Sequence, residues 1–184
     1  MAMYTRWELA PPLSAKFTPG RIGDVVWTYY GDLLVGKRFV DVLRQANASG
    51  FQTQPVTLGA DETLLLTAIG WGGMASAESK ICMAEHCESC GLTTYKVRAW
   101  PTRVVDPSRW DRSDIFMVWP LPRFLFVTER VAKAITDAGL SGLVCVPELA
   151  VIRRSSTYSP GRLEDAVGSA RARQYAASLH IQAE

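Results

Sequence analysis

Histidine, cysteine and long apolar runs are all scarce in this chain of 184 residues. The sequence contains only two histidines, His86 and His180, and four cysteines. A Ser-His-Asp or Cys-His catalytic system would have to use His86, because His180 lies in a tail that we expect to be mobile. The purely apolar runs span a few residues, far fewer than the ~20 needed to cross a bilayer. These shortages argue against an enzyme that relies on histidine and against a membrane protein.

An excess of charge of either sign is also missing. The chain has 20 basic and 18 acidic residues, which give a net charge of +2. A nucleic-acid-binding domain would show a strong or clustered basic excess, so we expect no nucleic-acid partner. The first residues, MAMYTRWELAPP, contain no apolar segment typical of a signal peptide. We therefore expect a cytoplasmic protein, in which cysteines stay reduced and bind metal or react rather than form structural disulfides.

What the chain does contain is ordinary for a globular protein, with 48% hydrophobic and 21% charged residues. A length of 184 residues suits one domain with its own core. No low-complexity linker divides the sequence. We therefore predict a single α+β domain over residues 1–184, with a C-terminal helix over residues 160–184 that frays at its end.

An internal repeat with an offset of 92 residues is the most informative pattern. When residues 26–55 are laid over residues 118–147 without gaps, nine of the thirty pairs are identical, and these include Trp27/Trp119, Arg38/Arg130, Ser49/Ser141 and Gly50/Gly142. Conserving these residue types in register indicates a duplicated supersecondary unit. The repeat predicts two related strand-helix-strand units, residues 26–56 and 118–147, around a mixed or antiparallel sheet.

Each copy is consistent with that plan at the local level. In the second copy Thr128 suits a helix N-cap, and Gly139 suits the positive φ that ends a helix. Asn47 takes the place of Gly139 in the first copy, and asparagine is the next-best residue for that conformation. The sequence LVCVPEL, residues 143–149, is predicted to follow the second helix as a buried strand.

The repeated arginines, Arg38 and Arg130, fall early in the two predicted helices, where the helix dipole disfavours a cation. One interpretation is a surface arginine whose apolar stem covers its neighbours while the charge stays in water. The other is a buried arginine that is the partner of a carboxylate. The sequence leaves both open.

The segment CMAEHCESCG, residues 82–91, gathers three of the four cysteines and one histidine. Cys87 and Cys90 form a CxxC pair followed by glycine, the spacing of a zinc knuckle, and Cys82 and His86 are the candidates for the third and fourth ligands of one structural zinc ion. A metal-free turn is an equal alternative. A redox dithiol is a third, but it would need a helix after the motif, where LTTYKV predicts a strand.

The loop DPSRWDRSD, residues 106–114, places an aromatic residue among charges. Trp110 in such a polar setting has the composition of an interface hot spot, although it could also fold back onto the sheet. Asp111 and Asp114 are candidate partner-binding carboxylates, but aspartates in turn-rich loops more often form caps and turns. A catalytic carboxylate pair at this spacing is the weaker interpretation.

Taken in order, the segments GWGG, CxxCG followed by a tyrosine-containing strand, RWDRSDIFMVWPLPRFLFVTERV and AGLSGLVCVP resemble a family of bacterial immunity proteins. That family belongs to polymorphic-toxin systems and includes the myxobacterial double-CxxCG immunity proteins. The resemblance covers residues 70–147 most closely, and this chain has one CxxCG where the double-motif proteins have two. It implies a non-catalytic protein that binds and neutralises a cognate toxin in the cytoplasm. A zinc-binding regulatory or nucleic-acid-associated module is the alternative.

Overall fold

The computed structural model describes residues 13–15, 23–28, 31–58, 61–152 and 157–168, together with residues 172 and 175. Its helices are α1 (Lys37–Gln45), α2 (Glu129–Asp137) and α3 (Leu163–Val167), with short 3-10 turns η1 (Ala77–Ser79) and η2 (Glu148–Val151). Its strands are β1 (Leu13–Ala15), β2 (Val25–Trp27), β3 (Leu33–Val35), β4 (Phe51–Leu58), β5 (Asp61–Ala68), β6 (Gly70–Met74), β7 (Ile81–His86), β8 (Thr93–Val97), β9 (Ile115–Trp119), β10 (Phe126–Val127) and β11 (Thr157–Tyr158).

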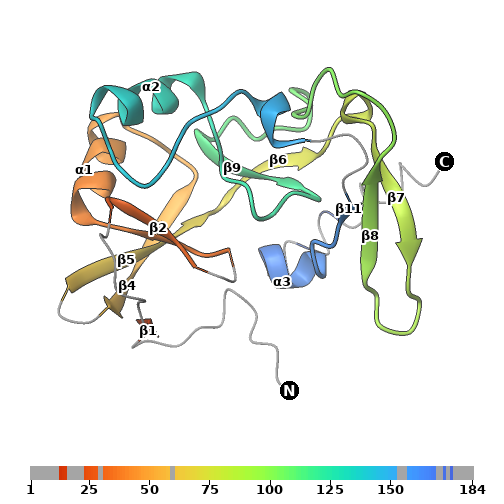
Figure 1. The fold of residues 1–184 in the computed structure, drawn as a ribbon, viewed down its shortest axis with the longest axis horizontal. Coiled ribbons are helices and arrows are strands. Elements are labelled where there is room, and N and C mark those ends of the chain that lie inside the picture. The colour runs from red at the N-terminus through yellow and green to blue at the C-terminus, as the bar shows by residue number, and fades with distance from the viewer. Residues whose placement is uncertain are drawn as a thin grey trace.

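The described strands form three sheets, in the orders β1-β4-β5-β3-β2, β10-β9-β6 and β11-β8-β7. The first two are mixed, because β1 and β4 are parallel, as are β6 and β9, while their other neighbours are antiparallel. Figure 1 shows α1 and α2 together at one end of the molecule and the β7–β8 hairpin at the other. The predicted α+β fold class is confirmed.

The two helices of the repeat form as the sequence predicts. In α1 the buried positions include Phe39 and Leu43, one turn apart, and in α2 Val131 and Ile135 repeat that spacing. An apolar residue every three or four positions puts a stripe on one side of a helix, and both stripes face a shared core. This core lies where the two helices meet the strands of both copies.

Both helices also end as predicted, in a residue with positive φ. That residue is Asn47 (φ 48°) after α1 and Gly139 (φ 59°) after α2. Thr128 is the residue that precedes α2, but its hydroxyl does not cap the helix. It donates instead to Asp114 Oδ1 at 2.9 Å.

The hairpins before the helices match with a shift of two residues. Val25 pairs with Val35 in the first hairpin, and Ile115 pairs with Val127 in the second. Val35 and Val127 are 92 residues apart, but Val25 and Ile115 are 90 apart, because the second hairpin has a connection two residues longer. The equivalence of Trp27 and Trp119 that the ungapped repeat predicts is therefore wrong. Trp27 is 44% exposed at a strand end, whereas Trp119 is 2% exposed in the core.

From here on, unit one denotes residues 24–56 and unit two denotes residues 114–147. Their final segments differ. In unit one residues 51–58 form β4, which pairs with β1 and β5. In unit two the equivalent residues 143–147 belong to no strand, and the chain turns into η2 at Glu148. The predicted buried strand over residues 143–149 is absent from the structure.

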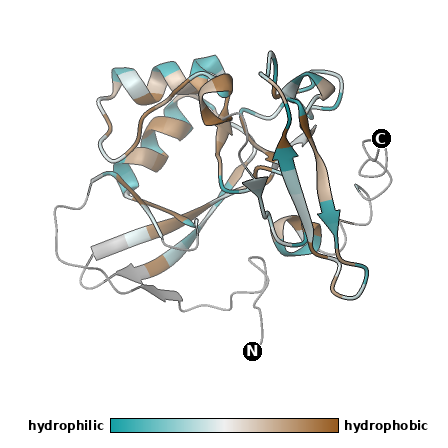
Figure 2. Cartoon of the chain, turned by 45° about the vertical axis from the view of Figure 1, so that its right-hand side comes forward, coloured by the Kyte–Doolittle hydropathy of each residue, from teal (hydrophilic) through white to brown (hydrophobic). Residues whose placement is uncertain are grey.

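A second core surrounds β6, β8 and β9 and is closed by α3 and residues before it, such as Ile152. Trp119 Nε1 donates to the hydroxyl of Tyr95 at 3.0 Å inside this core and ties β9 to β8. In Figure 2 brown and teal residues alternate along the helices, while teal covers much of the β7–β8 hairpin. The hairpin thus extends from the second core with a largely polar surface.

The predicted C-terminal helix over 160–184 begins near its expected place, as α3 at Leu163. Beyond residue 168 the structure describes only Ala172, which is buried, and Tyr175, whose ring stacks on Trp71 at a centroid distance of 4.1 Å. His180 and the rest of the predicted helix lie outside the described residues. Among the residues that are described, no helix is long and apolar enough to cross a membrane.

Candidate functional site

A polar cluster around Asp24 joins unit one to unit two. Asp24 Oδ2 accepts hydrogen bonds from the backbone nitrogen (2.8 Å) and the hydroxyl (2.9 Å) of Ser141, and it pairs with Arg38 Nη1 at 3.2 Å. In return the Asp24 backbone nitrogen donates to Ser141 Oγ at 3.0 Å. Asp24 precedes β2, and Ser141 lies in the turn after α2. The contact therefore links residues 117 positions apart in the sequence.

The same cluster occurs a second time around Asp114, with the units exchanged. Asp114 Oδ2 accepts from the backbone nitrogen and the hydroxyl of Ser49, both at 3.0 Å, and Asp114 Oδ1 pairs with Arg130 Nη2 at 2.7 Å. The Asp114 backbone nitrogen donates to Ser49 Oγ at 3.1 Å. The two units are therefore related by an approximate two-fold exchange of contacts.

The repeated arginines complete this exchange. Ala138 is the C-cap residue of α2, and its carbonyl accepts a hydrogen bond from Arg38. Ala46 is the C-cap residue of α1, and its carbonyl accepts a hydrogen bond from Arg130. Each cation thus lies at the negative end of the other unit's helix, where the helix dipole favours it. Both arginines pair with a carboxylate, but their side chains are 58% and 52% exposed, so the prediction of a buried arginine is wrong.

Both aspartates are held in the charged form. For Asp24, hydrogen bonds from Ser141 are the main cause that lowers the pKa below its ordinary value, assisted by Arg38 and opposed by burial. For Asp114, burial is the largest single influence and raises the pKa, but bonds from Ser49, Thr128 and Arg130 together outweigh it and leave the pKa lowered. These clusters are structural joints between the units.

The three residues predicted to bind a partner lie in the loop before β9 and contact their own chain. Trp110 is partly buried: its Nε1 donates to the Ser113 carbonyl at 3.0 Å, and its ring lies 5.3 Å from that of Phe116. Asp111 Oδ2 accepts from the Trp71 backbone nitrogen at 2.7 Å. Asp114 holds the joint described above. A role for these residues in binding a partner stays a prediction, and each has a structural role in addition.

The CxxC motif lies in the turn between β7 and β8. The backbone nitrogen of Cys87 donates to the Leu92 carbonyl at 2.9 Å, and that of Gly91 donates to the Cys87 carbonyl at 2.7 Å. Gly91 adopts φ 70°, a conformation that suits glycine and lets the chain reverse within the motif. The turn exposes Cys87 to solvent and leaves Cys90 partly covered.

The two thiols of this turn interact with each other. Hydrogen bonds from Ser89 and Cys90 lower the pKa of Cys87 to about 7, the hydroxyl of Ser89 being the largest cause. The Cys87 sulfur lies 3.0 Å from Ser89 Oγ. A thiol with such a pKa is partly ionised at neutral pH, and the thiolate is the form that binds metal or reacts with electrophiles.

The other two predicted zinc ligands, Cys82 and His86, lie on β7, the strand that precedes the CxxC turn. Cys82 Sγ donates to the Lys96 carbonyl at 3.5 Å, and His86 Nδ1 lies 2.8 Å from Thr93 Oγ1. Cys82 and His86 lie near opposite ends of β7, and the contacts of both are with residues of β8. Within the described chain, no group of three His, Cys, Asp or Glu residues could hold a metal. The residues therefore fit half of a tetrahedral zinc site, contributed by Cys87 and Cys90.

An exposed apolar segment at the end of unit two, residues 144–149, was not expected from the sequence. The side chains of Val144, Val146 and Leu149 are 83%, 51% and 39% exposed, while those of Leu143 and Cys145 pack against the core beneath the helices. Unit one carries polar residues, Gln52 and Gln54, at the positions equivalent to Val144 and Val146. That difference is the sequence signal that could have identified the segment.

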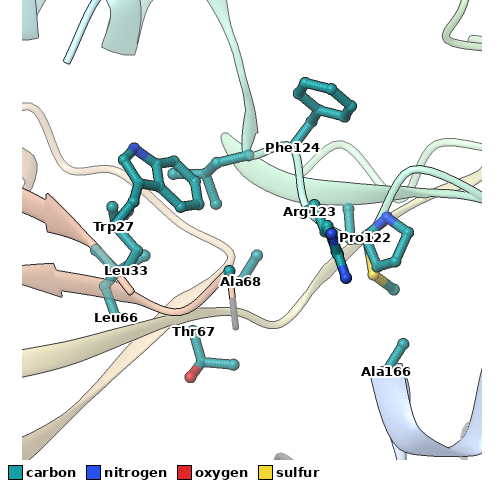
Figure 3. Close-up of a pocket in the computed structure, with 12 residues that line it drawn as sticks. Trp27, Leu33, Leu66, Thr67, Ala68, Pro122, Arg123, Phe124 and Ala166 are labelled. Carbon is teal, nitrogen blue, oxygen red and sulfur yellow. The ribbon is translucent and has the colours of Figure 1, made fainter. Parts of the chain in front are cut away.

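A small cavity lies between the first hairpin and the longer connection of the second. Trp27, Arg123 and Phe124 are among the residues that line it, as Figure 3 shows. Its volume of about 20 Å³ suits water molecules rather than a substrate.

No protein-family model matches the chain, and no curated protein matches its sequence.

Proposed function

We propose that the protein is an immunity protein that binds a cognate bacterial toxin in the cytoplasm and neutralises it by stoichiometric protein–protein interaction. The observation that carries the proposal is the exposed apolar segment of unit two. Three large aliphatic side chains, Val144, Val146 and Leu149, reach solvent within six residues. A concentration of exposed apolar side chains on a globular protein is typical of a site that another molecule covers.

The resemblance to immunity proteins supports the same reading from an independent direction. Its most specific part, WDRSDIFMVWPLPRF, supplies the Asp114 joint, strand β9 and the connection toward β10. The similar region ends at Pro147 and so includes Val144 and Val146. The region that resembles the family thus includes all of unit two and two of the three exposed aliphatic side chains.

Neutralisation by binding requires only a complementary surface. A standard interface buries about 800 Å² on each partner, and an apolar centre with a polar rim gives such interfaces their affinity. Val144 and Val146 would form part of the centre, covering the toxin's active site or the route of its substrate. No residue of the chain needs to take part in chemistry.

Co-expression with the toxin domain encoded next to this gene tests the proposal. We expect rescue of growth and a one-to-one complex that survives size-exclusion chromatography with light scattering. Rescue at strongly substoichiometric amounts would indicate an enzyme that destroys the toxin or repairs its damage, and would contradict the proposal. Failure to rescue would also contradict it and would favour the zinc-binding module, for which the paired thiols of Cys87 and Cys90 are the supporting observation and elemental analysis the measurement.

A further inference from the structure

Unit one shows what lies beside the final segment of a unit when its sheet is complete. There β4 pairs along its full length with the antiparallel strand β5, for example Thr53 with Leu66. Strand β5 in turn pairs with β3, so it occupies the place between the last strand of the unit and its hairpin. Its Leu66 side chain is buried in the core beneath the helices.

Among the residues that the structure describes, unit two has the flanking elements of this arrangement but no strand corresponding to β5. Strand β10, the counterpart of β3, lies at the edge of its sheet. Within the described part of the chain, the backbone of residues 143–146 makes no hydrogen bond. In Figure 1 the chain leaves α2 as coil and reaches η2 without joining a sheet. Backbone groups left unpaired in an extended segment are a template for another strand.

The side chains of residues 143–146 alternate as those of a strand do. Leu143 and Cys145 pack inward, whereas Val144 and Val146 face solvent. The outward positions hold β-branched apolar residues, which favour pairing across strands and contact with apolar side chains of a neighbour. Unit one, whose sheet is complete, holds glutamine at both positions.

Both ends of this segment are fixed. Ser141 is held by Asp24 and by Val25, whose backbone nitrogen donates to the Ser141 carbonyl at 3.2 Å. Glu148 accepts hydrogen bonds from the backbone nitrogens of Val104 (3.2 Å) and Val105 (3.1 Å). A segment anchored at both ends loses little conformational freedom when a partner binds, which favours affinity.

We infer that residues 143–147 are the docking edge for an extended strand of the partner, which adds to unit two by backbone pairing as β5 does to β4. The inference rests on the proposed function, because it takes the cognate toxin as the partner. The toxin segment is an edge strand or an extended loop with apolar side chains at alternate positions, one set meeting Val144 and Val146. Recognition by strand addition draws affinity from the main chain and specificity from those side chains.

Amide hydrogen exchange in the free protein and in the purified complex with the toxin domain tests the inference directly. Strand pairing protects every second amide along one edge, so the complex should protect either residues 144 and 146 or residues 143 and 145 by at least tenfold. The free protein should exchange all four rapidly. Unchanged exchange at all four amides in a stable complex would overturn the inference while leaving the proposed function intact.

Proline variants give a second, independent readout. Val144→Pro and Cys145→Pro each remove one amide donor, and Val144→Thr and Cys145→Thr keep the amide at the same position. We expect one of the two prolines to raise the Kd for the toxin at least tenfold, while its threonine control changes Kd by less than threefold. Equal effects of proline and threonine at both positions would identify side-chain docking and overturn the inference.

The variants are expected to fold, because neither amide donates a hydrogen bond within the described chain. Thermal unfolding checks this for each protein. If a proline variant does not fold, the exchange measurement on the wild-type complex decides alone. Dimers formed through this segment in place of a toxin complex would contradict the stated partner, and a wild-type chain that does not bind the toxin would contradict both the inference and the proposed function.

Discussion

At the scale of single residues, the cysteines show how local contacts set reactivity. Cys87 and Cys145 are both free thiols, but one lies in an open turn beside Ser89 and the other packs against the core. Hydrogen bonds lower the pKa of Cys87 to about 7, whereas burial raises the pKa of Cys145. Of these two thiols, Cys87 is therefore the more reactive and Cys145 the more protected.

Alkylation by iodoacetamide should follow this difference. The rate at Cys87 should rise with pH through a midpoint of about 7, because only the thiolate reacts. Ser89→Ala removes the main hydrogen bond and should move the midpoint to higher pH. Mass spectrometry of time courses between pH 5.5 and 9 measures both, with Cys145 as the internal slow control. A midpoint that Ser89→Ala leaves unchanged would show that Ser89 does not stabilise the thiolate.

At the scale of secondary-structure elements, sequence pattern was a good guide wherever local signals decide the outcome. The helix stripes, the positive φ of Asn47 and Gly139, and the strand after the CxxC motif all formed as predicted. Residues 143–147 did not form a strand, because strand formation depends on a neighbour that the sequence of the segment does not encode. The two-residue shift between the hairpins was likewise invisible to an ungapped repeat.

The candidate sites divide in the same way. The CxxC turn could be predicted because its structure depends on the ten residues around it. The positions of Trp110 and Asp111 depend instead on contacts with Phe116 and Trp71, which belong to other elements. The joints at Asp24 and Asp114 link residues more than 60 positions apart. No local pattern predicts such pairs, although the repeat of Arg38 and Ser49 at Arg130 and Ser141 marked four of the participants.

Two glycines in the turns that follow the helices, Gly50 and Gly142, should tolerate no side chain. Gly50 and Gly142 have φ 84° and 89°, and a Cβ at either would lie 2.2 Å from the carbonyl oxygen of Ile115 or Val25. Gly50→Ala and Gly142→Ala should each lower the free energy of unfolding by more than about 2 kcal/mol, from backbone strain and the clash together. Gly139→Ala is the matched control, with φ 59° and open space, and should cost about 1 kcal/mol. Urea unfolding measures all three, and equal costs would show that the close approach is unimportant.

At the scale of the whole molecule, the two joints make the units depend on each other. Each carboxylate bonds the serine turn of the other unit, and each arginine reaches the end of the other unit's helix. Because both aspartate pKa values are lowered in the folded state, ionisation stabilises the fold above the ordinary aspartate pKa of 3.8. This stabilisation is lost as the pH falls through the lower folded values.

Asp114→Asn should therefore weaken the protein most at neutral pH. Loss of the charge-assisted bonds should lower the free energy of unfolding at pH 7 by about 2 kcal/mol. The difference in the free energy of unfolding between wild type and variant should decrease below about pH 4, because the wild-type carboxylate takes up a proton. Asp41→Asn is the control: Asp41 is 43% exposed and, among the described residues, pairs with Arg44 alone, so loss of its charge should cost less than about 0.5 kcal/mol. If the loss of unfolding free energy in Asp114→Asn did not vary with pH, the stabilising role of the Asp114 charge would be contradicted.

The exchange of contacts between the units has the form of an isologous interface, the kind that joins the two subunits of a symmetric dimer. Each unit carries an aspartate and an arginine that bind the other unit. Each unit also carries a serine turn and a helix end to which the other unit's aspartate and arginine bind. A half-length chain with a single unit would thus own every group needed to pair with a second copy of itself. Linking both halves in one polypeptide removes the demand that they stay identical. One half could then lengthen its hairpin and leave a sheet edge open, while the other kept its sheet complete.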